Sequence, residues 1–120
     1  SLPPKLMKEN ENGIRVKVYV QGHMIGAGKM ELFRLVSQEG SIKSAAKVMG
    51  MSSKRANMLL KTIEEAFPQP ILEKQKGGKG TIITPFGDEL LKKYLVLCNH
   101  LSKESKVFVD WVASKQLFRE

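Results

Sequence analysis

The chain has 120 residues, of which 42% are hydrophobic and 27% are charged, and this length and composition are typical of one globular domain. No apolar run approaches the roughly 18 residues of a membrane span, and the first residues do not have the pattern of a signal peptide. Because there is a single cysteine, an internal disulfide is excluded, and we expect a cytoplasmic protein without membrane segments.

Basic residues outnumber acidic ones, with 20 lysines and arginines against 12 aspartates and glutamates and a pI near 9.7. Much of the excess lies in residues 41–80, which contain eight basic and three acidic residues. Clustered positive charge favours a polyanionic partner such as double-stranded DNA. A basic soluble protein without such a partner is the alternative that charge alone leaves open.

The first third of the chain predicts an arm, a strand and a helix. Residues 1–13 are polar and aperiodic, and we interpret them as a flexible N-terminal arm. Residues 14–21 alternate between apolar and polar side chains, which predicts a strand with Ile14, Val16, Val18 and Val20 on its buried face. A helix is expected over residues 29–39, and Gly40 suits the left-handed position at its end.

Residues 40–67 have the spacing of a helix-turn-helix. Ala45 and Ala46 are small enough to let two helices cross closely, and Gly50 suits the turn between them. Ser41 and Ser52 are expected to cap helices over residues 42–49 and 53 to about 67. The buried face of the second helix would consist of Ala56, Leu60, Ile63 and Phe67.

The second of these helices would be the recognition helix, which reads bases from its first turns. Lysine can bond guanine and asparagine can pair with adenine, so we expect Lys54 and Asn57 to read bases. The predicted DNA-contacting residues of this helix are Ser52, Ser53, Lys54, Arg55, Asn57, Met58 and Lys61. A helical hairpin with solvated charges is the alternative.

Two β-prone segments around a glycine and lysine loop predict a hairpin after residue 70, which would form the wing of a winged helix. Its tip residues Lys76, Gly77, Gly78 and Lys79 are expected to contact DNA phosphates. The tip lacks the spacing of a nucleotide-binding loop, because Gly80 rather than Ser or Thr follows Lys79. A flexible turn without a ligand is the alternative.

A long helix is expected after Thr84, which caps it, and Pro85, which suits its first turn. Its apolar stripe continues beyond the length that a compact winged helix can cover, so we expect a second copy of the chain to cover it. The predicted dimer interface comprises Leu91, Tyr94, Cys98, Leu101, Phe108 and Val112. The alternative is that the helix folds back onto its own domain.

The sequence shows no motif for catalysis. A nucleophile elbow, paired carboxylates and a metalloprotease motif are all missing, so we expect neither an enzyme nor a cofactor. Cys98, His23 and His100 do not cluster at ligand spacing, so no metal site is expected either.

Several short motifs occur together in this chain: Gly-Ser-Ile at 40–42, Ala-Ala-Lys at 45–47, Gly-Met-Ser at 50–52 and Gly-Gly-Lys-Gly at 77–80. In this combination the chain resembles the N-terminal DNA-binding domain of the molybdate-dependent transcriptional regulators (ModE type), which is similar to the LysR-type winged helix-turn-helix. The resemblance covers about residues 14–94 and implies a homodimer that binds DNA and regulates transcription.

The chain departs from that family in two respects. Family members usually carry an aromatic pair around the start of the recognition helix, where this chain has Ser53 and Asn57, so no operator preference is implied. Full-length members also carry C-terminal oxyanion-binding domains. This chain ends after one helix, so we expect no molybdate site and compare it with shorter stand-alone members.

We therefore predict an α+β winged helix-turn-helix with an N-terminal strand, a β-hairpin wing and a long C-terminal helix. The expected division is an arm at 1–13, the DNA-binding domain at 14–85 and a dimerisation helix at 86–120. The expected function is a homodimeric, sequence-specific regulator of transcription. A winged-helix module for protein–protein interaction and a non-specific DNA-binding protein are the alternatives.

Overall fold

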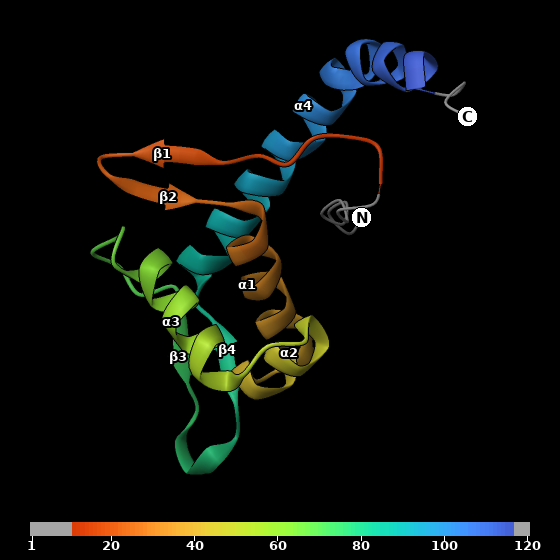
Figure 1. The fold of residues 1–120 in the computed structure, drawn as a ribbon. Helices are drawn as coiled ribbons and strands as arrows, with labels where there is room; N and C mark the ends of the chain where they lie inside the picture. The colour runs from red at the N-terminus through yellow and green to blue at the C-terminus, as the bar shows by residue number, and fades with distance from the viewer. Residues whose placement is uncertain (1–10, 117–120) are drawn as a thin grey trace.

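A computed structural model describes residues 11–116, so most of the expected arm and the last four residues of the expected C-terminal helix lie outside it. The described chain forms two β-hairpins and four α-helices, which confirms the predicted α+β winged helix-turn-helix (Figure 1). Its elements in chain order are β1 (Val18–Val20), β2 (His23–Ile25), α1 (Ala27–Glu39), α2 (Ile42–Met49), α3 (Ser53–Glu64), β3 (Leu72–Lys74), the short 3₁₀ turn η1 (Lys76–Gly78), β4 (Thr81–Ile83) and α4 (Pro85–Gln116).

The strand expected over residues 14–21 is shorter in the structure, because within this segment only β1 pairs with another strand. β1 pairs antiparallel with β2 through a two-residue turn, in which Gln21 and Gly22 both have positive φ, of 48° and 82°. The prediction that Val20 is buried was wrong, since it is 55% exposed. The end of this hairpin extends beyond the helices (Figure 1).

Helix α1 forms the centre of the core. Its apolar side chains at helical spacing are all buried, namely Met30, Leu32, Phe33, Leu35 and Val36. The helix begins at Ala27, two residues earlier than predicted, and ends before Gly40. Gly40 has φ 80° as expected, and its N–H donates to the carbonyl of Val36 at 2.9 Å.

The helix-turn-helix follows the predicted spacing. The hydroxyl of Ser41 accepts from the N–H of Ser44 at 3.0 Å, and that of Ser52 accepts from the N–H of Arg55 at 3.1 Å, so both caps are confirmed. Gly50 has φ 71° in the turn. The two helices contact each other and α1 through Ala45, Ala46, Ala56, Leu60 and Ile63, all of which are buried.

Helix α3 ends at Glu64 rather than near residue 67. The N–H groups of Ala66 and Phe67 donate to carbonyls three residues back, at 3.0 and 3.2 Å, which is the hydrogen-bond pattern of a 3₁₀ turn at the end of a helix. Pro68 then excludes a helical continuation. Phe67 still packs inward, with its ring edge against Phe86 at a centroid distance of 5.3 Å.

The β3–β4 hairpin is the predicted wing, and it is anchored to the end of α1. Its strands are antiparallel with Leu72 opposite Ile83, and the N–H of Thr81 donates to the carbonyl of Gly40 at 2.8 Å. A side chain on Gly80, which has φ 100°, would collide with that carbonyl. Glycine at this position therefore sets how closely the wing approaches the helices.

The first turns of helix α4 pack in the core, and its later turns project from the domain. Leu91, Tyr94 and Leu95 are buried in the domain, and the Tyr94 hydroxyl donates to the carbonyl of Val16 at 2.7 Å. The later turns of α4 project from the rest of the domain (Figure 1). The molecule as a whole measures 57 × 32 × 30 Å. None of the described helices, α4 included, is long and apolar enough to cross a membrane.

Candidate nucleic-acid interface

The outer face of α3 is polar and basic. Lys54, Met58 and Lys61 lie four and three residues apart and therefore share one face, opposite the buried Ala56 and Leu60. Met58 is 56% exposed. The predicted contact residues of this helix are all exposed, namely Ser52, Ser53, Lys54, Arg55, Asn57, Met58 and Lys61.

Two of these polar side chains already make bonds within the helix. The Nδ2 of Asn57 donates to the carbonyl of Ser53 at 2.9 Å, which leaves one amide hydrogen and the Oδ1 for a base edge. The Ser52 hydroxyl accepts the N–H of Arg55 as the cap. Ser52 therefore has a structural role in addition to any contact with DNA.

A groove separates α3 from the wing. It consists of two adjoining hollows, of about 370 and 430 Å³, which share Ile42, Asn57, Lys74 and Thr81. We call it the wing groove. Three lysines line it from three different elements: Lys43 from α2, Lys61 from α3 and Lys74 from β3. One acidic residue, Glu64, lies among the residues that line it.

Lys43 and Lys74 are functional candidates that the sequence analysis missed. Both were counted in the basic excess, but neither was assigned to the site. Alternate residues of a strand share a face, so Lys74 lies on the same face as Leu72, which packs against the core. This period-two pattern was the available signal for Lys74. For Lys43, the sequence offered no signal that α2 begins beside the wing.

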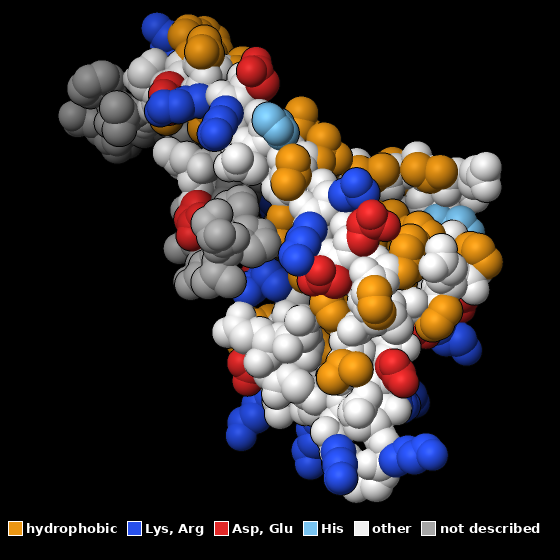
Figure 2. All heavy atoms as spheres, turned by 180° about the vertical axis from the view of Figure 1, so that it is seen from behind, with side chains coloured by type: hydrophobic (Ala, Val, Ile, Leu, Met, Phe, Trp, Pro, Cys, Tyr) orange, Lys and Arg blue, Asp and Glu red, His pale blue; other side chains and the backbone are white. Residues whose placement is uncertain are grey.

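The lysines and arginines of α3, the wing groove and the wing tip form no ion pair with a carboxylate of residues 11–116. Within residues 11–116, ion pairs occur only on α1 and α4, and they join Glu31 to Arg34, Asp88 to Lys92 and Asp110 to Lys106. Figure 2 shows Lys and Arg side chains gathered at the lower end of the molecule, where the wing lies in Figure 1. Such a surface attracts phosphates.

The tip of the wing is a tight, exposed turn. Gly77 and Gly78 have φ of 69° and 72°, which favour glycine, and Lys76 and Lys79 flank them with exposed side chains. The structure thus brings Lys76, Gly77, Gly78 and Lys79 to one end of the hairpin, on the side of the domain that carries the wing groove.

The predicted dimer residues do not share one surface. Leu91 and Tyr94 are buried in the core of this chain, which fits the fold-back alternative for the first turns of α4. Cys98 and Val112 are partly buried, and burial raises the pKa of the Cys98 thiol. Leu101 and Phe108 are exposed, at 37% and 69%.

The projecting part of α4 exposes further apolar side chains that the sequence analysis did not assign. Leu97, Val107 and Trp111 are 40%, 83% and 58% exposed, and the Trp111 ring stacks on Phe108 at 6.3 Å. Residues 11–14 also line a hollow of about 310 Å³ together with Phe108, Val109, Val112, Ala113 and Gln116. The N-terminal segment therefore lies beside the end of α4 and shields part of the predicted stripe.

Comparison with known proteins identifies the type of domain. The family model for the bacterial regulatory helix-turn-helix protein, lysR family, matches residues 28–88, which is half of the chain and includes α2, α3 and the wing. The chain belongs to this family. As a lysR-family chain it carries the helix-turn-helix of a DNA-binding transcriptional regulator, as the sequence motifs predicted.

Curated relatives match over the same part of the chain. The chain is 34% identical to the transcriptional regulator ModE of Haemophilus influenzae over 94 residues, which are 76% of this chain and 36% of that protein. It is 30% identical to the molybdenum-pterin-binding protein MopB of Rhodobacter capsulatus, over 61% of this chain and 28% of that protein. It is also 30% identical to the molybdenum transport protein ModE of Azotobacter vinelandii, over 63% of this chain and 29% of that protein. The chain therefore matches about a third of the length of these relatives.

Proposed function

We propose that the chain binds specific sequences of double-stranded DNA as a homodimer and regulates transcription in the cytoplasm. In this proposal α3 enters the major groove and the wing contacts the sugar-phosphate backbone. The observation that carries the proposal is the exposed outer face of α3 beside a wing groove with three lysines. Membership of the lysR family supports it.

Base reading is assigned to the first two turns of α3. Lys54 and Asn57 are exposed there, and their side chains can bond guanine and adenine respectively. Lys43, Lys61 and Lys74 would meet phosphates where the wing groove faces the duplex. Base contacts supply specificity and phosphate contacts supply most of the affinity, so the two sets of residues should behave differently.

The proposed dimer uses two apolar patches on α4, one at Leu97 and Leu101 and the other at Phe108 and Trp111. Figure 2 shows hydrophobic side chains exposed along this helix. A second copy is the occupant we propose, because a two-fold axis buries the same patches of both chains. It would also present two α3 helices to successive half-sites, roughly 34 Å or a multiple of it apart.

Molybdenum is not part of this proposal. Two of the relatives have molybdenum in their names, but the chain matches only 28% and 29% of those proteins. No group of three or more His, Cys, Asp or Glu residues that could hold a metal occurs among the described residues.

The deciding experiment is selection of bound sites from random DNA with the full chain. We expect one enriched sequence with two-fold symmetry. Binding without enrichment would instead mean a non-specific DNA-binding protein. If mobility shifts show no binding even at low salt, the protein–protein interaction module becomes the better interpretation.

Alanine variants of Lys54 and Asn57 test which residues read bases. Each variant should lose discrimination at one or two positions of the selected site, by about 1–3 kcal/mol per lost contact. Lys103→Ala is the matched control, because Lys103 is exposed on the projecting part of α4 and makes no ion pair with a described residue. If both α3 variants selected the same DNA site as the wild type, the proposal that α3 is the recognition helix would be wrong.

Alanine variants of Lys76 and Lys79 test the wing. Each should weaken binding about equally on all sequences and reduce the slope of log K against log salt by about 0.9 per lost phosphate contact. Salt titrations by fluorescence anisotropy measure this slope. A loss confined to one sequence at unchanged slope would mean that the wing reads bases.

Leu101→Glu combined with Phe108→Glu tests the dimer. Both side chains are exposed in the isolated chain, so the variant should fold and sediment as a monomer that binds the palindrome much more weakly. Unfolding of the variant would show that these side chains stabilise the domain itself. A variant that is still dimeric would place the interface elsewhere.

A further inference from the structure

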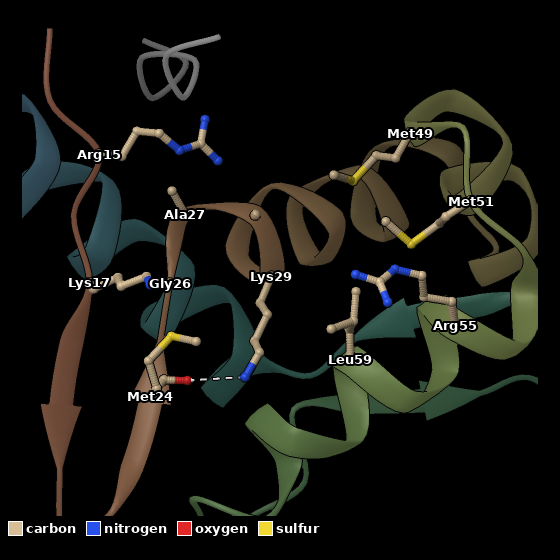
Figure 3. A pocket seen from close by; sticks show the side chains of 11 residues that line it. Arg15, Lys17, Met24, Gly26, Ala27, Lys29, Met49, Met51, Arg55 and Leu59 are labelled. Atoms are coloured by element: carbon tan, nitrogen blue, oxygen red, sulfur yellow. Dashed lines mark hydrogen bonds between the residues drawn. The ribbon is translucent and has the colours of Figure 1, made fainter. Parts of the chain in front are cut away.

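A second concave site lies on the flank of α3 that faces the β1–β2 hairpin. Its volume is about 520 Å³, within the usual range for small-ligand sites. Its walls come from the segment that leads into β1, from β2, from the start of α1, from the end of α2 and the turn after it, and from α3 itself (Figure 3). We call it the hairpin cavity. The proposed function assigns no role to it except through Arg55.

Four basic side chains line this cavity, and no acidic side chain among residues 11–116 does. Arg15 and Lys17 come from the segment before β1, Lys29 from α1 and Arg55 from α3. Figure 3 shows Arg15 and Lys17 on one side and Arg55 on the other, with Lys29 between them. Lys17, Lys29 and Arg55 come from three parts of the fold, and an anion bound among them would offset their mutual repulsion.

Lys29 is the most enclosed of the four. It is partly buried, whereas the other three are exposed, and its Nζ lies 3.5 Å from the carbonyl oxygen of Met24. No described carboxylate lies within ion-pair distance of Lys17, Lys29 or Arg55. A partly desolvated ammonium group without a carboxylate is a favourable place for an anion.

The remaining side chains of the wall are apolar. Met24, Met49, Met51 and Leu59 line the cavity, and methionine adapts readily to the shape of an apolar ligand. An inorganic ion or a DNA phosphate would leave this apolar surface unused. The combination of cations and methionines therefore fits a ligand that has both a charged group and an apolar body.

We propose that the hairpin cavity binds a small organic anion. Its phosphate or carboxylate would lie among the basic side chains, and its apolar body would lie against the methionines. The proposal does not depend on DNA binding, since the cavity would take its ligand in either case. Because Arg55 and Leu59 belong to α3, an occupied cavity would connect the N-terminal hairpin to the recognition helix.

The methionine methyl groups can be used as NMR probes of ligand binding in the cavity. The full chain has six methionines, and selective carbon-13 labelling of their methyl groups makes each visible by NMR. Met24, Met49 and Met51 report on the cavity. Met30 is fully buried in the core and Met58 is exposed on the outer face of α3, so these two serve as internal references.

Phenyl phosphate is the test ligand, with inorganic phosphate and phenol as its charged and apolar halves. We expect saturable shifts of the three cavity methyls with phenyl phosphate, and binding at least about tenfold weaker with either half, since each lacks one set of contacts. Met30 and Met58 should move little. The absence of saturable shifts at the cavity methyls would overturn the proposal.

Lys17→Gln combined with Lys29→Gln removes two of the charges without touching the residues proposed to bind DNA. This variant should bind phenyl phosphate about tenfold more weakly or worse. Lys103→Gln, on the projecting part of α4, is the matched control and should bind normally. Equal binding by both variants would overturn the site, and an unchanged Met30 signal shows that the core is intact.

A short random-sequence DNA duplex tests whether the cavity takes the phosphate of a small organic ligand or a phosphate of the DNA backbone. The proposed function expects the duplex to shift the Met58 signal, whereas the cavity proposal expects only that the cavity methyls still respond to phenyl phosphate. If the duplex alone moves the cavity methyls and phenyl phosphate does not, the cavity belongs to the DNA-backbone surface and the small-ligand proposal is wrong.

Discussion

The two halves of α4 have similar apolar content but opposite environments. In the first half, Leu91, Tyr94 and Leu95 are 6%, 5% and 1% exposed. In the second half, Val107, Phe108 and Trp111 are 83%, 69% and 58% exposed. The first half therefore contributes to the stability of the domain, whereas these side chains of the second half are accessible to solvent. An apolar stripe on one helix can thus serve two purposes, and burial decides which.

The largest difference between the halves should appear on truncation of a leucine. Leu95→Ala removes a fully buried side chain, so the free energy of unfolding should fall by about 2–5 kcal/mol. Leu101→Ala, in the second half and 37% exposed, should cost less than about 1 kcal/mol. Urea unfolding of both variants measures the contrast, and equal losses would mean that the two sites do not differ in burial.

A glycine in the first half gives the next largest effect. A side chain at Gly87 would collide with the carbonyl of Ile71 and lie 2.9 Å from Cζ of Phe33. Gly87→Ala should therefore destabilise the domain by about 1–3 kcal/mol, although alanine favours helices.

Gly28→Ala is the matched control for this substitution. Gly28 is also helical, but among residues 11–116 a Cβ there meets only the Nη2 of Arg15, at 4.0 Å. This variant should be neutral or more stable by up to about 1 kcal/mol. Stabilisation of both glycine variants in thermal melts would show that α4 approaches Ile71 less closely than described.

Tyr94→Phe should have a smaller effect that depends on pH. Burial raises the pKa of the Tyr94 phenol above its ordinary value of 10.0, and the neighbouring Cys98 adds to the shift. The unfolded chain therefore releases this proton at lower pH than the folded chain, so the tyrosine's contribution to stability is complete below about pH 10 and declines as pH rises above it.

The measurement is urea unfolding at about pH 8 and about pH 10.5. At the lower pH Tyr94→Phe should cost about 1 kcal/mol, because the bond to the Val16 carbonyl is lost. At the higher pH the gap between wild type and variant should narrow. Tyr19→Phe is the control, since Tyr19 is 69% exposed and should change stability little at either pH. A gap that widens with pH would contradict this assignment.

The smallest effect on the folded monomer is expected in the second half. Trp111→Ala should change the free energy of unfolding by less than about 0.5 kcal/mol at concentrations where the chain sediments as a monomer. Under the proposed function, the same substitution should weaken dimerisation at higher concentration. A large loss of monomer stability would show that Trp111 packs on its own chain.

Much of the fold could be predicted because local chemistry specifies it. Ser41 and Ser52 cap their helices through bonds to residues three positions later, and Gly40 and Gly50 adopt left-handed conformations at the helix ends. The glycines and lysines of the wing likewise mark the turn between β3 and β4. Each of these features depends on neighbours within a few residues, so a single sequence contains the information.

The candidate site could be predicted only in part. Exposure of Lys54, Asn57 and Lys61 follows from helical periodicity around the buried Ala56 and Leu60. The positions of Lys43 beside the wing and of Arg55 beside the N-terminal hairpin do not follow from it. Each depends on which element packs against which flank of α3.

By itself the sequence determined the types and order of the elements, their caps and turns, and the polar face of α3, because these depend on bonds and spacings within a few residues. The tertiary structure alone decided how far the core extends along α4, how close the wing lies to Gly40 and which side chains meet in the hairpin cavity. Those features depend on contacts between residues far apart in the chain. Hydrophobic periodicity shows that a face is apolar, but it does not show which surface covers that face.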